Sequence, residues 1–181
     1  MEAVPRSPVS QVTSLDERLV ACFSVRMFIA RENEKHWEAI MNATNVYLTF
    51  NGNCREAMTF YATCLGGEPN FTTFAQGPPE IAAMGKDAPD RILHGELHSG
   101  PVKLMASDTM PGMAFQVGNN FSIAIHCDTL AEMERLFGAL SAGGKVTMAM
   151  HDAFWGGRFG MLTDRFGISW MLTYRAPGQH S

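Results

Sequence analysis

The stretch FWGGRFGMLTDRFGISWML, residues 154–172, decides the fold. Two apolar, β-prone runs, 158–163 and 168–174, flank the tetrapeptide Asp-Arg-Phe-Gly at 164–167. Asp at the first position and Gly at the last position are typical of a type I turn. The stretch therefore predicts a β-hairpin.

Directly before this hairpin, two glycines stand between an indole and a guanidinium. Gly156 and Gly157 let the backbone approach a ligand closely, and Trp155 and Arg158 flank them. Arg158 can bind a carboxylate or phosphonate, or it can pair with Glu96 or Asp164 inside the protein. The other interpretation of Trp155 is a core tryptophan that follows a glycine bend.

Outward from the hairpin, one pattern occurs twice along the chain, which indicates an internal duplication. The first copy predicts a strand at 45–50, a helix ended by Gly66-Gly67, a strand at 68–75 and a hairpin of 91–99 with 102–108. The second predicts a strand at 121–127, a helix ended by Gly143-Gly144, a strand at 145–150 and the hairpin above. The expected class is α+β, with modules at 42–108 and 121–176 and a linker at 109–120.

Helix starts and loops are also marked in the sequence. Asn53 with Glu56, and Thr129 with Glu132, have the spacing of capping boxes. The segment 76–90 contains three prolines and predicts a long exposed loop that could act as a lid.

Composition excludes several classes of protein. The 181 residues are 46% hydrophobic and 18% charged, which is typical of a globular chain. The net charge is −4, without a basic run, which argues against a nucleic-acid surface. The apolar segment 19–30 carries Arg26 and is too short to cross a membrane. Four scattered cysteines indicate reduced thiols in a cytoplasmic protein.

The N-terminal region differs from the rest of the chain. Residues 1–41 combine a polar, turn-rich start with a charged segment, and Met41 directly precedes the first clean strand. One hypothesis makes Met41 the biological start, with the preceding residues as a disordered or non-native extension. The other makes them an ordinary helix packed on the domain. Residues 177–181 are expected to be a tail.

A histidine-rich strand carries candidate chemistry. If Gly100-Pro101 forms a two-residue turn, one face of the hairpin carries His94, Glu96 and His98 together with Lys103, Met105 and Ser107. His94 beside Glu96 is a candidate general acid/base pair. With His98 they could also hold a divalent metal. The remaining interpretations are a polar wall that binds a ligand and a purely structural hydrogen-bond network.

Several separated motifs follow one another along the chain: Tyr47-Leu48-x-Phe50-x-Gly52-Asn53-Cys54, Ala57-x-x-Phe60-Tyr61, Gly66-Gly67-Glu68, His94-x-Glu96-Leu97, Leu104-Met105-x-Ser107-Asp108, and residues 154–160 through 163–171. In this order they resemble the vicinal oxygen chelate superfamily (glyoxalase I, bleomycin-resistance proteins, extradiol dioxygenases), and most of all its PhnB-like branch. That branch also carries the label 3-demethylubiquinone 3-methyltransferase. The resemblance covers about residues 42–175. It implies two βαβββ modules curling around a cleft, and a homodimer, but no single reaction.

The resemblance also implies where a metal would bind. The family's ligand positions, carried over by motif, fall on Val46, Met105, Ser122 and Met171. None is a good ligand for a hard divalent ion, and a thioether suits copper(I) instead. A one-residue slip of the first strand of each module would offer ligands that are no better. The usual metal site is therefore expected to be absent.

Two main functions follow as expectations, and the sequence does not decide whether the protein is an enzyme. The first is a dimeric small-molecule binding protein without a confident cofactor. Its expected ligand-binding residues are Phe50, Met105, Ser107, His126, Trp155, Arg158 and Met171, with His94 also meeting the ligand's polar end. The alternative is a metal-assisted lyase, isomerase or dioxygenase that uses catalytic His94 and Glu96 with His98. A third is a regulatory dimer with a vestigial cleft. The sequence contains no glycine-rich methyl-donor motif, so the methyltransferase label has no support from residues.

Overall fold

The structure is a computed structural model that describes residues 45–176. The predicted extension at 1–41, the hypothesis about Met41 and the predicted tail at 177–181 lie outside the described residues.

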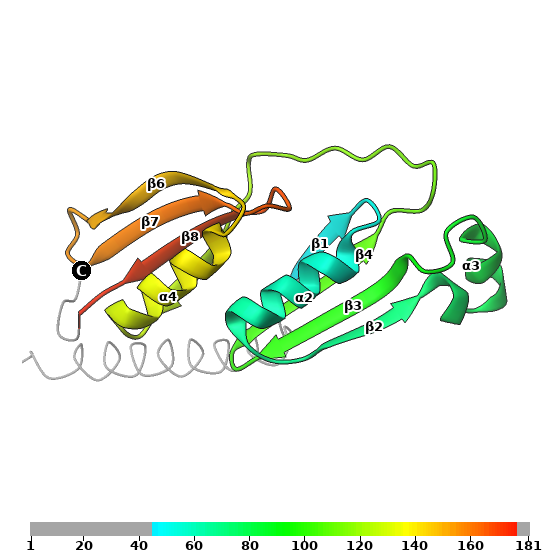
Figure 1. Cartoon of the computed structure of the whole chain (residues 1–181), viewed down its shortest axis with the longest axis horizontal. Helices are drawn as coiled ribbons and strands as arrows, with labels where there is room; N and C mark the ends of the chain where they lie inside the picture. Colours follow the sequence, from blue (N-terminus) through cyan, green and yellow to red (C-terminus); the bar gives the residue numbers. More distant parts are fainter. Residues whose placement is uncertain (1–44, 177–181) are drawn as a thin grey trace, which may run out of the picture. The chain divides into compact units, whose positions relative to one another are not determined.

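Two modules of the same topology follow each other along the chain (Figure 1). The first comprises β1 (Val46–Phe50), α2 (Cys54–Leu65), β2 (Pro69–Thr73), a 3₁₀ turn η1 (Phe74–Gln76), α3 (Pro79–Met84), β3 (Ile92–Ser99) and β4 (Val102–Asp108). The second comprises β5 (Ile123–Cys127), α4 (Leu130–Ser141), β6 (Lys145–Asp152), β7 (Arg158–Thr163) and β8 (Ser169–Tyr174). The predicted βαβββ duplication is confirmed.

Each module forms one mixed sheet. The first sheet has the strand order β1-β4-β3-β2 and the second sheet has β5-β8-β7-β6. In both, the first strand pairs in parallel with the last, and the other neighbours are antiparallel. The predicted turn closes the β7–β8 hairpin, where Gly167 N–H donates to the carbonyl of Asp164.

The prediction for segment 76–90 needs correction. It is not a continuous loop, because the 3₁₀ turn η1 ends there and α3 follows it. Proline explains the start of α3, since Pro79 occupies the first turn of the helix, where a missing N–H costs no hydrogen bond. Residues 109–122, which include the predicted linker, form neither helix nor strand.

One helix covers one face of each sheet, and the two helices also contact each other. On β1, Leu48 and Phe50 are buried toward α2 while Tyr47 and Thr49 are exposed. The second sheet repeats this alternation on β8, where Trp170 and Leu172 are buried. The opposite face of each sheet is called here the helix-distal face. Side chains that alternate with the buried residues, such as Tyr47 and Met171, belong to it.

A buried carboxylate joins the two modules. Asp164, 4% exposed, accepts hydrogen bonds from the Tyr61 hydroxyl of α2 and from Trp170 Nε1, both at 2.8 Å. Its other oxygen accepts from the backbone N–H groups of Phe166 and Ile168. Four donors compensate for the free-energy cost of removing this charge from water. A buried carboxylate without such partners would be strongly destabilising.

The first of the two predicted capping boxes is absent, and the second forms in part. Asn53 makes no side-chain capping bond, and Asp108 at the end of β4 takes that role by accepting from Gly52 N and Cys54 N at 2.7 and 3.0 Å. For α4, Thr129 accepts from Glu132 N as expected. The Glu132 carboxylate, however, accepts from Asp128 N, one residue before the cap.

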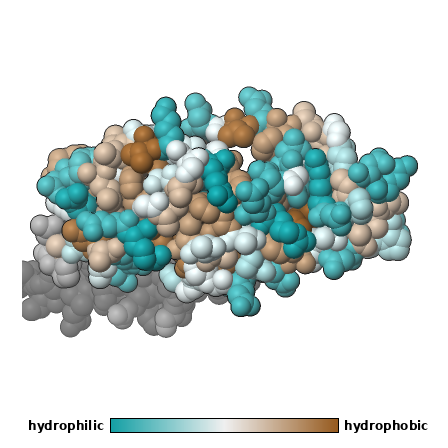
Figure 2. Space-filling view, viewed as in Figure 1, coloured by the Kyte–Doolittle hydropathy of each residue, from teal (hydrophilic) through white to brown (hydrophobic). Residues whose placement is uncertain are grey.

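The helix-bearing face mixes hydrophilic and hydrophobic residues across both modules (Figure 2). In the part of the chain from 45 to 176, no helix is both long and apolar enough to cross a bilayer.

Candidate ligand-binding site

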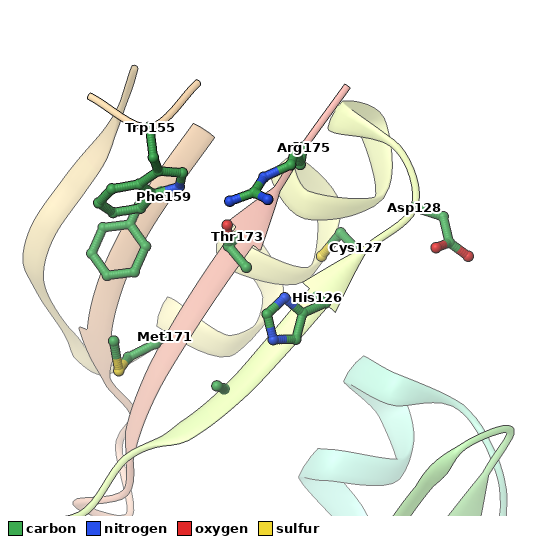
Figure 3. A pocket seen from close by; sticks show the side chains of 9 residues that line it. His126, Cys127, Asp128, Trp155, Phe159, Met171, Thr173 and Arg175 are labelled. Atoms are coloured by element: carbon green, nitrogen blue, oxygen red, sulfur yellow. The ribbon is translucent and has the colours of Figure 1, made fainter. Parts of the chain in front are cut away.

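A cavity of about 700 Å³ opens on the helix-distal face of the second sheet. Strands β5, β7 and β8 and the loop between β6 and β7 supply its walls (Figure 3). The lining residues are Ala124, His126, Cys127, Asp128, Trp155, Phe159, Met171, Thr173 and Arg175. Strand alternation explains most of this set, because these residues alternate with the side chains that pack against α4.

An aromatic corner forms one wall of the cavity. The rings of Trp155 and Phe159 lie 5.7 Å apart at 72°, an edge-to-face arrangement. Phe154 adds a second edge-to-face contact with Trp155 and is itself 96% exposed. Two backbone hydrogen bonds, Ala153 N to Gly157 O and Gly156 N to Ala153 O, close the loop that carries Trp155.

The positive φ of Gly157, 108°, serves the fold directly. A Cβ at this position would collide with the carbonyl oxygen of Tyr174 at the end of β8. The glycine therefore permits a close approach of two backbone segments, whereas the sequence had suggested a close approach to a ligand.

Polar groups converge from the other side of the cavity. Figure 3 shows the Arg175 guanidinium extending toward Thr173, with the His126 imidazole on the neighbouring strand and the Asp128 carboxylate turned away. Within residues 45–176, no acidic side chain forms an ion pair with Arg175. The cavity is thus apolar and aromatic at one end and cationic at the other.

Cys127 lines the cavity but is not a nucleophile at neutral pH. It is 6% exposed, and burial raises its pKa to about 11. The thiol therefore stays protonated, and the thiolate is the form that reacts.

Three of the predicted ligand-binding residues line this cavity: His126, Trp155 and Met171. Phe50, also predicted to bind the ligand, does not line this cavity. This side chain is 2% exposed and packs edge-to-face with Phe166 in the core, because β1 turns it toward α2.

Arg158 does not line this cavity either. Arg158 shares the face of β7 with the buried Leu162, on the side of α4, and Phe159 takes the cavity side. Its Nη1 lies 3.3 Å from Asp152 Oδ1, so neither expected internal partner, Glu96 or Asp164, pairs with it.

The histidine-rich strand forms a separate cluster on the helix-distal face of the first sheet. Glu96 bridges the two histidines, with 3.1 Å from His94 Nε2 to Oε1 and 3.1 Å from His98 Nε2 to Oε2. Lys103 Nζ lies 3.8 Å from Oε1, and the Tyr47 hydroxyl lies 3.4 Å from His94 Nδ1. Hydrogen bonds from His98 and His94 lower the pKa of Glu96 to about 2.

This cluster shares no wall with the cavity of the second sheet. The residues that the sequence assigned to one cleft therefore lie on two different sheets. Met105 and Ser107 belong to β4 of the first sheet, where they pair with Tyr47 and Thr49. Among residues 45–176, no three His, Cys, Asp or Glu side chains are arranged to hold a metal ion. Both histidine Nε2 atoms instead point at Glu96.

The sheet register shows where the positions carried over for the family's metal ligands lie. Met105 pairs with Tyr47, so Val46 points to the core, where it packs against the buried cluster. Met171 pairs with Ala124, and Ser122 lies one residue before β5. The side chains paired at these positions are Met105 with Tyr47 and Met171 with Ala124. Their two thioethers, phenol and methyl group do not fit a hard divalent ion.

Sequence reasoning missed Phe159, Thr173 and Arg175. A signal for two of them was present, since a period of two from Met171 along β8 reaches Thr173 and then Arg175. The same period on β7 places Phe159, rather than Arg158, on the side of Met161.

Comparisons with known proteins agree with this fold. The family model described as 3-demethylubiquinone-9 3-methyltransferase matches residues 41–173. Protein YjdN of Escherichia coli K12 is 35% identical over 135 residues, covering 70% of this chain and 90% of YjdN. The crystal structure of PA1353 from Pseudomonas aeruginosa superposes with a TM-score of 0.65 at 39% identity, covering 74% of this chain and 98% of PA1353.

A more distant structure shows the wider fold. A glyoxylase/bleomycin resistance protein/dioxygenase domain from Frankia sp. EAN1pec superposes with a TM-score of 0.55 at 12% identity, covering 78% of this chain and 96% of that domain. With the duplicated βαβββ topology, these matches establish that the chain belongs to the PhnB-like family described as 3-demethylubiquinone-9 3-methyltransferase and has the glyoxalase/bleomycin-resistance fold.

Proposed function

We propose that this protein binds a small molecule in the cavity of the second sheet and does so without a divalent metal. The observation that carries the proposal is the cavity itself, in which an aromatic corner faces a few converging polar groups. Its volume of about 700 Å³ falls in the range of about 300–1,000 Å³ common for small-molecule sites.

The proposal includes a cytoplasmic homodimer. Large apolar side chains are exposed at 39–96% of their surface, and such groups favour burial against a partner. They include Tyr47, Met148, Phe154 and Trp155. Sedimentation of the purified protein tests the dimer. The cytoplasmic location rests on free cysteines at positions 54, 64 and 127, which fit a reducing compartment.

A ligand screen with a pocket-filling variant tests the binding function. A ligand that binds only the native state stabilises it by about 2.7 kcal/mol at a concentration of 100 times Kd. We expect aromatic ligands to raise Tm and to change the fluorescence of Trp155. Ala124→Phe, which fills the exposed cavity face of β5, should abolish both effects.

The matched control is Ala131→Phe, which adds the same side chain at an exposed position of α4 that is not part of the cavity wall. It should leave ligand binding intact. Equal ligand responses in the two variants would show that the cavity is not the binding site.

A second candidate function is a metal-assisted enzyme using His94, Glu96 and His98. The three side chains lie close together on β3, but both histidine Nε2 atoms face Glu96 and the three are not arranged to hold a metal ion in the structure. Elemental analysis after incubation with zinc, manganese or iron(II) tests this alternative. A stoichiometric metal that is lost in the double variant His94→Ala/His98→Ala would support it, and no bound metal under any condition would exclude it.

A further inference from the structure

We propose that the ligand of the second-sheet cavity is a flat, apolar ring system that carries one anionic group, with the anion held by Arg175. This inference rests on the proposed function, because it names the class of molecule that the cavity takes. Neither the family nor its relatives determine this class. It follows from the placement of charge and aromatic surface in the cavity.

The cationic end of the cavity is suited to a carboxylate. The Arg175 guanidinium extends over the cavity beside the Thr173 hydroxyl (Figure 3), and no acidic residue in the range 45–176 neutralises it. A guanidinium presents paired N–H donors that match the two oxygens of a carboxylate. Asp128, the one acidic side chain on the cavity wall, turns its carboxylate away.

The other end is suited to a planar ring. Trp155 and Phe159 meet at 72°, so a ring that stacks on one of them presents its edge or face to the other. Met171 closes the wall below them with a flexible thioether that adapts to ring shape. Two backbone hydrogen bonds close the loop that carries the indole.

The sheet register places the aromatic corner next to the polar side of the cavity. Phe159 pairs directly with Thr173 across β7 and β8, so the aromatic corner and the hydroxyl are cross-strand neighbours. The Cβ atoms of such a pair lie about 4.5–5.5 Å apart. A ring with a directly attached anion can therefore contact Phe159 and the polar side of the cavity at the same time.

Two probes of equal ring size separate charge from ring binding. Naphthoate and its neutral counterpart naphthalenemethanol are titrated calorimetrically into the full-length protein. Naphthoate should bind the wild type more tightly. Arg175→Gln keeps hydrogen-bond donors but removes the charge. It should lower the affinity for naphthoate by about tenfold or more, as expected for loss of a charged hydrogen-bond partner, and leave the affinity for naphthalenemethanol nearly unchanged.

Two further variants serve as controls. Arg158→Gln removes the same charge on the opposite face of β7 and should not change either affinity, since Arg158 pairs with Asp152 outside the cavity. Trp155→Ala should lower the affinity for both compounds, because both contact the indole surface. Circular dichroism verifies that each variant is folded, and Arg175→Lys, which restores the charge, should recover part of the naphthoate affinity.

The outcomes are distinguishable. Equal affinity for the two compounds, or equal weakening of both by Arg175→Gln, would overturn the anion assignment and leave the binding function standing. The absence of binding by both compounds would overturn this inference, and the proposed function would fall with it only if the ligand screen also finds no compound whose stabilisation Ala124→Phe removes.

Discussion

Removing one hydroxyl from the contact between the modules should destabilise the whole domain. Tyr61 of α2 is fully buried and donates to Asp164 of the second module over 2.8 Å. Burial and the adjacent Asp164 carboxylate raise the pKa of Tyr61, so the hydroxyl stays protonated and donates at every accessible pH. Tyr61→Phe deletes this donor and keeps the ring.

The structure sets the magnitude. A hydrogen bond to a charged group contributes about 1.5–3 kcal/mol. Asp164 keeps Trp170 Nε1 and two backbone donors, so it is not left unpaired. The phenylalanine ring retains the edge-to-face contact with Trp170 and opens no cavity. We therefore expect a loss of about 2 kcal/mol in the free energy of unfolding, or roughly 6–10 °C in Tm for a domain of this size.

Urea unfolding followed by circular dichroism measures this loss. The matched control is Tyr47→Phe, because Tyr47 is 49% exposed and its hydroxyl lies 3.4 Å from His94 Nδ1. That variant should stay within about 0.5 kcal/mol of the wild type. If Tyr61→Phe were equally mild, or the control equally costly, the assigned role of the buried carboxylate would be refuted.

Three further predictions concern the core, a turn and the histidine cluster. Phe50→Ala should lower the free energy of unfolding, measured in urea, by about 3–5 kcal/mol, because it empties a core position. The folded variant should keep its ligand affinity. A selective loss of affinity would show that Phe50 contributes to the binding site. Gly67→Ala should reduce Tm far more than Gly100→Ala. Both glycines have positive φ, but of the two only Gly67 lies where a Cβ would collide with a backbone atom, the carbonyl oxygen of His98. Equal effects of the two substitutions on Tm would contradict this reasoning. The lowered pKa of Glu96 stabilises the folded state above its ordinary pKa of 4.5, and this contribution is lost as the pH falls toward about 2. The Tm advantage of wild type over Glu96→Gln should therefore shrink across that interval, and a constant difference would exclude the linkage.

Local signals were sufficient for most of the fold. The Asp164–Gly167 turn, the helix that ends at Gly66-Gly67 and the duplicated order of elements all follow from residues close together in the chain. Segment 76–90 was mispredicted because its prolines indicated a loop, although Pro79 is compatible with a helix start.

The candidate site was predicted only in part. His126, Trp155 and Met171 line the cavity as expected, whereas Phe50 and Arg158 point to the other face of their sheets. Alternation along a strand shows which residues share a face. It does not show which of the two faces a helix covers, so Arg158 was chosen where Arg175 is the cation of the cavity.

The sequence by itself determined the two βαβββ modules, their turns and their family, because periodicity and turn chemistry act between residues a few positions apart. Only the tertiary structure decided which donors the buried carboxylates bind. Asp108 caps a helix that starts 54 positions earlier, and Asp164 accepts a donor from 103 positions away. Such pairings depend on how the sheets and helices pack, and a buried carboxylate takes whichever N–H or O–H donors that packing brings within reach.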